Sequence, residues 1–264
     1  VKAVEPNTGD TLLSLERLKV ELRFWKLLKK EVEIEEISIR NATFDTRDFI
    51  DGVVVSGHLG ELFLESHGVV FSPETARINE FSVKNTDVSL TLGSIESTDT
   101  VPSEPLYWKI LLDEIDFENV GFALKMPQDS LFVRTMLPKT TLKNGVIDLK
   151  EASYYVKSFG IDNAELAYGP KEDLFLQQIG LQLDSIYYCG KDIRANIEEF
   201  VLKERSGLEL VSTEGRIVSD SVLIQIPKFT MKTTASSLDL QTKIGWDVLE
   251  MKKAGVLSAK IKAD

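Results

Sequence analysis

Apolar and polar residues alternate along most of this 264-residue chain. An apolar residue stands at every second position in the runs 18–24, 37–39, 88–92, 179–183 and 222–226. A period of two is typical of β-strands with one apolar face and one solvated face, whereas a helix would give a period of 3.6. The pattern therefore predicts an all-β fold.

A longer motif, apolar-x-x-apolar-x-apolar-x-Asn-x-x-apolar, occurs four times. Its copies begin at Ile34, Ile78, Leu112 and Val156, and weaker copies without the asparagine begin at Ile197 and Ile226. With 43% hydrophobic residues, chance gives roughly 0.3 matches around the eight asparagines of the chain, so four matches indicate a true repeat. The irregular spacing favours an elongated, twisted antiparallel sheet or groove over a strict helical solenoid.

Two places in each repeat break the alternation, for example between Ile34 and Ile37 and between Asn41 and Phe44. A bulge or a bend at each place would return the apolar residues to one face, and asparagine tolerates the left-handed backbone that such kinks need. We therefore interpret the repeated asparagines as structural, with a polar functional role as the alternative. They are Asn41, Asn85, Asn119 and Asn163.

Pairs of carboxylates fall into the first break of the repeat, at 35–36, 113–114 and 198–199. Adjacent residues of a strand point to opposite faces, so these pairs are not arranged for acid–base catalysis. We interpret them as solvated bulge positions.

Turns are predicted at 72–73, 169–170, 189–190 and 206–207, and residues 143–146 (Lys-Asn-Gly-Val) give the clearest signal for a tight hairpin. Short amphipathic helices are predicted at 24–30 and 247–253. Each of the tyrosine pairs at 154–155 and 187–188 should place one ring in the core and one in water.

The organisation predicted is a single repetitive β region over residues 1–264, with a possible soft subdivision near 95–105. The sequence starts without methionine and stops inside a predicted strand, so we expect it to be part of a longer chain. A targeting or anchoring segment is expected outside it, because no apolar run approaches the ~20 residues of a membrane span.

The net charge is −11. This acidic balance disfavours nucleic acid as a partner and disfavours electrostatic docking on an anionic membrane. The single cysteine, Cys189, allows no internal disulfide and is expected to be a small buried apolar residue.

No familiar catalytic or metal-binding motif occurs. The two histidines, His58 and His67, stand beside glycines and are expected at turns or at a rim. No zinc-ligand spacing, nucleophile elbow or phosphate-binding loop is found. The expectation is a non-catalytic protein with no metal and no cofactor.

Three segments, 11–46, 107–124 and 145–168, resemble the AsmA/TamB family of the bacterial envelope. In the first, a strand leads into a short leucine-rich helix and then into a strand that opens with the repeat; the other two carry the same cadence of strands. The resemblance covers most of residues 11–170.

What the resemblance implies is a taco-like β-groove in the periplasm, anchored to the inner membrane by an amino-terminal helix that lies outside this sequence. Such proteins are thought to conduct phospholipid between the membranes or to aid outer-membrane biogenesis. An outer-membrane assembly protein would be met through a terminal domain that this chain lacks.

Period-two strands could supply the apolar inner face that a lipid conduit needs. The residues expected to line it are those between the two breaks of each repeat, with plain core contact as an equal alternative: Ile37, Ile39, Phe81, Val83, Ile115, Phe117, Phe159 and Ile161. Two other functions fit the same pattern. One is a structural or adhesive scaffold with a closed dry core; the other is a chaperone-like module that binds strands at a sheet edge.

Overall fold

The computed structural model describes residues 2–5, 9, 11–27, 33–47, 52–71, 74–93, 107–128, 130–249 and 258–263. They form one 14-stranded sheet and two short helices. The strands are β1 (Lys2–Val4), β2 (Thr11–Leu22), β3 (Ile34–Asp45), β4 (Val53–Phe71), β5 (Glu74–Leu92), β6 (Lys109–Met126), β7 (Leu131–Asp148), β8 (Ser153–Tyr168), β9 (Leu174–Cys189), β10 (Asp192–Glu204), β11 (Glu209–Ser219), β12 (Leu223–Thr233), β13 (Ser237–Gly245) and β14 (Ser258–Ala263).

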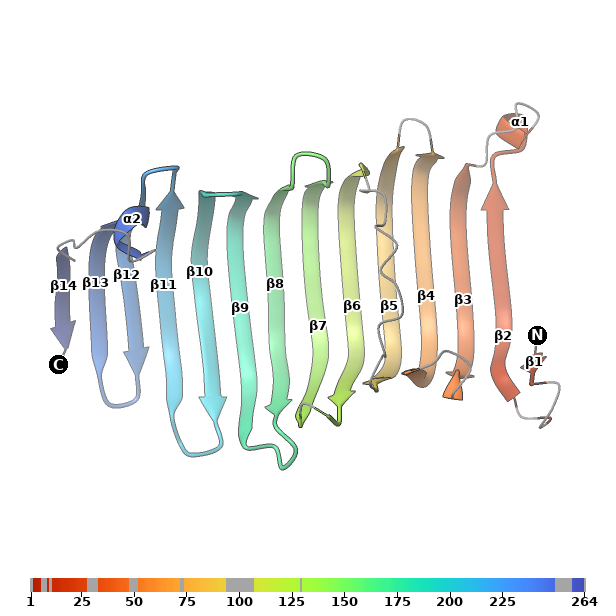
Figure 1. The fold of residues 1–264 in the computed structure, drawn as a ribbon, viewed down its shortest axis with the longest axis horizontal. Coiled ribbons are helices and arrows are strands. Elements are labelled where there is room, and N and C mark those ends of the chain that lie inside the picture. Colours follow the sequence, from red (N-terminus) through yellow and green to blue (C-terminus); the bar gives the residue numbers. More distant parts are fainter. Residues whose placement is uncertain are drawn as a thin grey trace.

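The predicted all-β class and elongated sheet are confirmed. The strands lie side by side in chain order, and the sheet does not close on itself (Figure 1). Both predicted helices are present as single turns, α1 (Phe24–Leu27) and α2 (Trp246–Leu249); residues 28–30 and 250–253 lie outside the described chain. Neither described helix has the length and hydrophobicity needed to cross a membrane.

One pair of strands departs from the antiparallel pattern. β5 and β6 are parallel, with Thr75 opposite Lys109 and Thr91 opposite Lys125. A parallel pair cannot be joined by a tight hairpin and needs a longer crossover connection. The predicted subdivision near 95–105 falls in this connection, outside the described residues.

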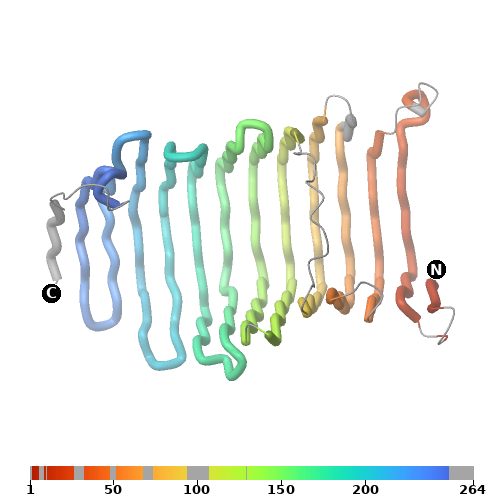
Figure 2. The backbone as a smooth tube through the Cα atoms, in the orientation of Figure 1, coloured from red at the N-terminus to blue at the C-terminus, as the bar shows by residue number. Residues whose placement is uncertain are grey.

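The strands share two common ends. β2, β4, β7, β9, β11 and β13 finish at what we call the upper end, where β3, β5, β6, β8, β10, β12 and β14 begin (Figures 1 and 2). Both α1 and α2 lie at this upper end (Figure 1).

The repeated asparagines all adopt the left-handed backbone conformation that the sequence suggested. Their φ angles are 48°, 50°, 52° and 55° for Asn41, Asn85, Asn119 and Asn163. The register aligns all four: Asn41 and Asn85 flank Gly60 of β4, Asn85 faces Asn119, and Asn119 and Asn163 flank Pro138 of β7. We call this line of kinks across the sheet the asparagine row.

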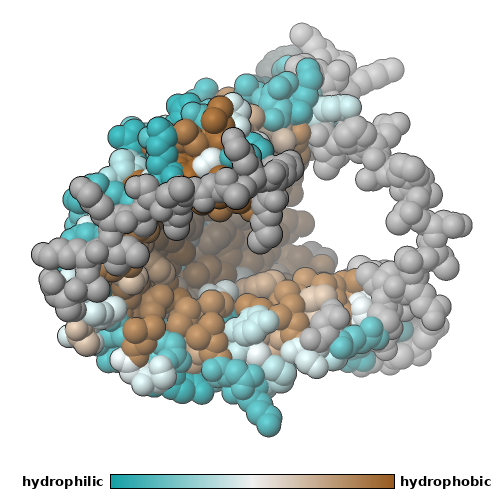
Figure 3. Space-filling view, turned by 60° about the vertical axis from the view of Figure 1, so that its left-hand side comes forward, coloured by the Kyte–Doolittle hydropathy of each residue, from teal (hydrophilic) through white to brown (hydrophobic). Residues whose placement is uncertain are grey.

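A second line of irregularities lies six residues nearer the upper end, at the first break of the repeat. The register shifts at Glu35 of β3, where Glu21 pairs with Glu36 and Leu22 with Ile34, and shifts again at Asn79 of β5. Bulges bend a strand and increase its twist. The two lines therefore divide each strand into a central segment and two ends that can turn toward one side, and Figure 3 shows the resulting hollow.

The predicted tight hairpin at residues 143–146 is wrong. Asn144 and Gly145 lie inside β7, where Gly145 pairs with both Leu112 and Val156. Asn144 has a φ of 52°, so the asparagine–glycine pair marks a local left-handed kink and does not reverse the chain. Gly169, Gly190 and Gly207 have positive φ in the connections where turns were predicted, and residues 72–73 lie outside the described chain.

Three single residues differ from expectation. His58 and His67 lie within β4, exposed on the strand and not at a turn. Cys189 is half-buried at the end of β9, with Sγ 3.8 Å from the carbonyl oxygen of Glu151. The glycines beside the two histidines lie within a strand and do not mark turns. Cys189 is only half-buried because few positions of an open sheet are fully covered.

Candidate functional site: an open apolar trough

A continuous line of apolar side chains crosses the central segments of the strands. Directly opposed residues of neighbouring strands share a face. We call the line through Phe81 the first row; it comprises Val20, Ile37, Leu64, Phe81, Ile115, Leu142, Phe159, Leu183 and Ile197.

A parallel line lies two residues away on the same face. This second row passes through Phe117 and comprises Leu18, Ile39, Leu62, Val83, Phe117, Thr140, Ile161, Leu181 and Phe200. The ring of Phe117 meets the ring of Phe81 edge-on, with centroids 6.1 Å apart. The two rows together form the floor of what we call the apolar trough.

All eight residues that the repeat singled out lie in these two rows, four in each. The expected lining left out residues of the strands between the repeats, which contribute Leu62 and Leu64 of β4, Leu142 of β7, and Leu181 and Leu183 of β9. Their own period-two alternation was the signal that could have found them.

The opposite face of the same segments carries many charged residues. Next to the first row, Glu65 lies opposite Glu36 and Glu80, and Glu114 lies opposite Lys143. The Lys143 Nζ is 2.9 Å from the Glu114 carboxylate, and this hydrogen bond raises the pKa of the lysine. Figure 3 shows the result: the hollow is lined by apolar residues and the exterior is largely polar.

The asparagine row switches the side to which odd and even residues point. Between the upper end and this row in β6, Ile115 and Phe117 belong to the trough, whereas beyond Asn119 the apolar positions are Val120, Phe122 and Leu124. The left-handed conformation of Asn119 reverses the alternation of side chains at this point. The odd-numbered apolar residues before it and the even-numbered apolar residues after it therefore lie on the same side of the sheet. The trough therefore has a wall beyond the asparagine row as well as a floor.

The trough has no second layer over it among the described residues. The buried apolar residues are few and mostly small: Ala42, Ala76, Val83, Leu112, Ala164, Ala167 and Leu210. The accessible surface is 16,980 Å², against about 11,600 Å² expected for a compact monomer of this mass. A single open sheet leaves more surface exposed than a compact fold of the same mass.

One polar residue interrupts the floor. Thr140 lies between Phe117 and Ile161 and is only 7% exposed, and its hydroxyl has no hydrogen-bond partner. A buried hydroxyl without a partner costs free energy. The methyl group of Thr140 keeps the floor apolar at this point, at the expense of that unpaired hydroxyl.

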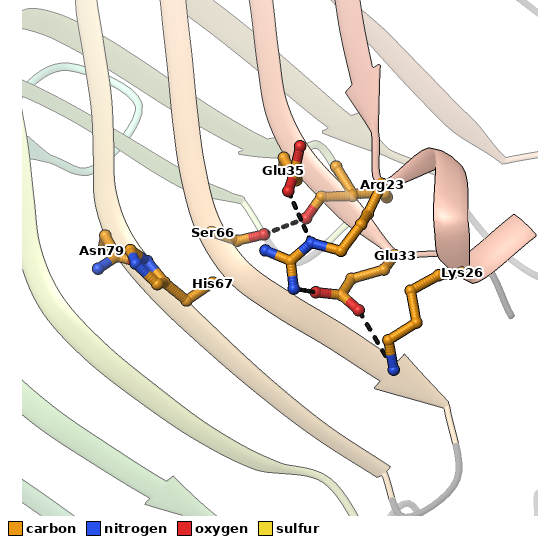
Figure 4. A network of polar contacts seen from close by, with 8 residues as sticks. Arg23, Lys26, Glu33, Glu35, Ser66, His67 and Asn79 are labelled. Atoms are coloured by element: carbon orange, nitrogen blue, oxygen red, sulfur yellow. Dashed lines mark hydrogen bonds and ion pairs between the residues drawn. The ribbon is translucent and has the colours of Figure 1, made fainter.

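At the upper end, a network of charged groups surrounds the buried carboxylate of Glu33. Glu33 has a side chain only 5% exposed and forms ion pairs with Arg23 and Lys26, and Arg23 also bonds Glu35 at 2.7 Å (Figure 4). A buried carboxylate needs such partners. The network joins α1 to the start of β3.

The neighbouring polar groups of Figure 4 have partners as well. The Ser66 hydroxyl donates to the carbonyl oxygen of Ile34, and Nδ1 of His67 meets Oδ1 of Asn79. Within the described residues no group of three or more histidine, cysteine or acidic side chains is placed to hold a metal ion.

Comparison of the chain with models of known protein families gives no match, and no curated protein matches it significantly.

Proposed function

We propose that this chain is a segment of a non-catalytic lipid conduit of the bacterial envelope, in which the apolar trough holds phospholipid acyl chains. The observation that carries the proposal is the pair of apolar rows, which run across the central strands without a charged residue. The envelope location, the passage between inner and outer membranes and the role in outer-membrane biogenesis follow from the AsmA/TamB resemblance and belong to the proposal.

The physical case is the cost of exposing an acyl chain to water. Each methylene contributes roughly 0.8 kcal/mol, so moving a 16-carbon chain into water costs on the order of 12 kcal/mol. A trough lined by Ile37, Phe81, Ile115 and Phe159 offers apolar contact along the direction perpendicular to the strands. No reacting group is required for this function.

The open sheet favours the lipid conduit over a scaffold with a closed dry core. A dry sandwich would need a second sheet over the rows, and the described strands form one open sheet. Leu18 and Val20, at the β2 end of the two rows, are 52% and 48% exposed. Such exposed apolar surface is typical of a ligand or interaction site.

A specific observation also favours the strand-binding alternative. β1 pairs with β2 only at Thr11, Leu13 and Ser14, and among the described residues 16–22 of β2 pair with β3 alone. An unpaired edge can accept an added strand. This site would be at one end of the sheet, whereas the trough extends across it.

The test is native mass spectrometry of the chain after exposure to phospholipid vesicles, followed by organic extraction of bound lipid. The informative variants are Phe117→Asp and Phe159→Asp, which place a carboxylate in the floor. The matched control is Phe63→Asp, since Phe63 lies opposite Ser38 and Ser82 on the outer face.

We expect bound phospholipid in the unaltered chain and in the Phe63 variant, and its loss from both floor variants while circular dichroism shows an intact sheet. A folded chain that carries no lipid would refute the trough function. Lipid that survives both floor substitutions would place the binding elsewhere.

A further inference from the structure

The aromatic side chains that carry a polar atom are concentrated at the upper end of the sheet. The chain has three tryptophans and six tyrosines, and the structure describes all of them. All three tryptophans and five of the tyrosines lie among the first or last residues of strands, or in the helices and connections, at this end. Only Tyr168 lies at the lower end, as the last residue of β8.

Six of these side chains form what we call the aromatic rim. Trp25 is in α1, Trp246 begins α2, and the other four flank or begin the central strands at this end (Figure 1 shows the elements). They are Trp25, Tyr107, Trp108, Tyr154, Tyr188 and Trp246.

Much of the rim is open to solvent. Trp25 is 73% exposed and its neighbour Phe24 is 63% exposed, while Tyr107 is 54% exposed. Large aromatic side chains contribute to folding mainly through burial, so this exposure gives little stability. Their position is better explained by a partner that contacts this end of the sheet.

The rim continues into the trough. Tyr154 and Tyr188 face each other across β8 and β9 with ring centroids 5.9 Å apart, and they share the inner face with Ile147 and Ile193. Tyr155, by contrast, lies opposite Tyr187 on the outer face. The prediction that one ring of each pair lies in the core is wrong, because Tyr154, Tyr155 and Tyr188 are all exposed on this open sheet. Apolar surface therefore runs from the floor to the rim.

Several charged groups at this end are held in ion pairs, although the whole chain is acidic. Glu33 is paired with Arg23 and Lys26, and Lys109 lies 3.6 Å from Asp148. Charges held in such pairs are less available to a strongly charged partner. A surface with both charges and an apolar layer beneath fits better.

We propose that the aromatic rim docks on the headgroup boundary of a zwitterionic phospholipid bilayer. Tryptophan and tyrosine are enriched at this boundary, because the ring enters the apolar layer while the N–H or O–H stays among the headgroups. The trough could hold lipid without touching a bilayer, so docking is a separate property. It would bring the open side of the trough at Tyr154 and Tyr188 to the membrane surface.

The experiment is flotation of the chain with phosphatidylcholine vesicles, combined with tryptophan fluorescence. Because all three tryptophans are at the upper end, docking should shift their emission to the blue, and lipids brominated near the headgroup should quench it. The double variant Phe24→Ser/Trp25→Ser should weaken vesicle binding roughly tenfold, the factor that corresponds to about 1.4 kcal/mol. The double variant Phe132→Ser/Tyr168→Ser is the matched control at the lower end and should bind within about twofold of the unaltered chain.

Absence of flotation and of the blue shift would overturn the docking proposal, as would equal loss in the control variant. Binding to anionic vesicles alone would also overturn it. The Phe117→Asp variant separates the two proposals: it should lose trough lipid in mass spectrometry and still float with vesicles. Lipid in the trough with no flotation would refute docking alone.

Discussion

The Nδ2 of Asn119 donates a hydrogen bond to Oδ1 of Asn85, 3.3 Å away, from the same position of the next repeat. Both residues have positive φ and face each other across the parallel pair β5 and β6. The asparagine thus serves two purposes: it permits the left-handed kink, and it ties that kink to the kink in the next strand. The shape of the trough depends on these kinks staying aligned.

Replacement of Asn119 by alanine should lower the free energy of unfolding by about 1–2 kcal/mol, because alanine tolerates positive φ less well and makes no side-chain hydrogen bond. Asn119→Gly should lose less, since glycine adopts this backbone freely. Asn196→Ala is the control, because Asn196 lies in β10 without positive φ. Urea unfolding measures all three; equal losses for Asn119→Ala and Asn196→Ala would contradict the role of the kink.

Gly60 is required where the kinked strands approach each other. A Cβ at this position would lie 2.6 Å from the carbonyl oxygen of Asn85 and 2.8 Å from that of Lys84. Both are backbone atoms, so Gly60→Ala should destabilise the sheet by about 2–3 kcal/mol. At Gly93 the nearest atom would be 3.5 Å away, so Gly93→Ala should change stability little. A tolerated Gly60→Ala, seen as an unchanged urea midpoint, would show that the strands are farther apart here.

Thr140→Val should be neutral or should stabilise the protein by up to about 1 kcal/mol. The change removes a buried hydroxyl that has no partner and keeps the shape of the side chain. Thr86 is the matched comparison, because its equally buried hydroxyl donates to the carbonyl oxygen of Lys84 at 3.0 Å. Thr86→Val should cost about 1 kcal/mol. The reverse order of the two unfolding free energies would argue against an apolar floor at Thr140.

Glu172 links Arg134 and Arg205 on the outer face, at 2.7 Å and 3.1 Å. The hydrogen bond from Arg134, followed by that from Arg205, lowers the pKa of Glu172 below its ordinary value of 4.5. A lowered carboxyl pKa gives stability that is present above the unfolded-state pKa and is lost as the pH falls through the folded-state pKa. The melting temperature of Glu172→Gln should therefore lie slightly below that of the unaltered chain at pH 7. The gap should close in acid and shrink in high salt. A difference in melting temperature that widens in acid would contradict the lowered pKa of Glu172.

Much of this fold could be predicted from the sequence because two signals agree. Period-two alternation fixes strands, and the repeat fixes where they kink, as the φ of Asn41 and Asn163 confirms. Two strands without a repeat asparagine also belong to the asparagine row: β4 contributes Gly60 and β7 contributes Pro138. Glycine and proline are residue types that often occur at kinks, although these two positions do not match the motif.

Other features depended on distant parts of the chain. Nothing in the local alternation distinguishes the parallel pairing of β5 and β6 from an antiparallel one, because apolar residues alternate in the same way in both. The Asn144–Gly145 pair carries the chemistry of a tight turn, yet its strand continues because neighbours on both sides hold it in the ladder. The aromatic rim was missed because its members are far apart in sequence and only the shared register brings them to one end.

The most direct test of the trough is a photo-crosslinking scan along β6 with a benzophenone amino acid placed at each residue from Ile115 to Leu124, in the presence of phospholipid. We expect lipid adducts at 115 and 117 but not at 116. Beyond Asn119 the phase should change, with adducts at 120, 122 and 124 and none at 121 or 123. An unbroken alternation through Asn119, or adducts on both faces alike, would contradict a kinked strand with one lipid-bearing face.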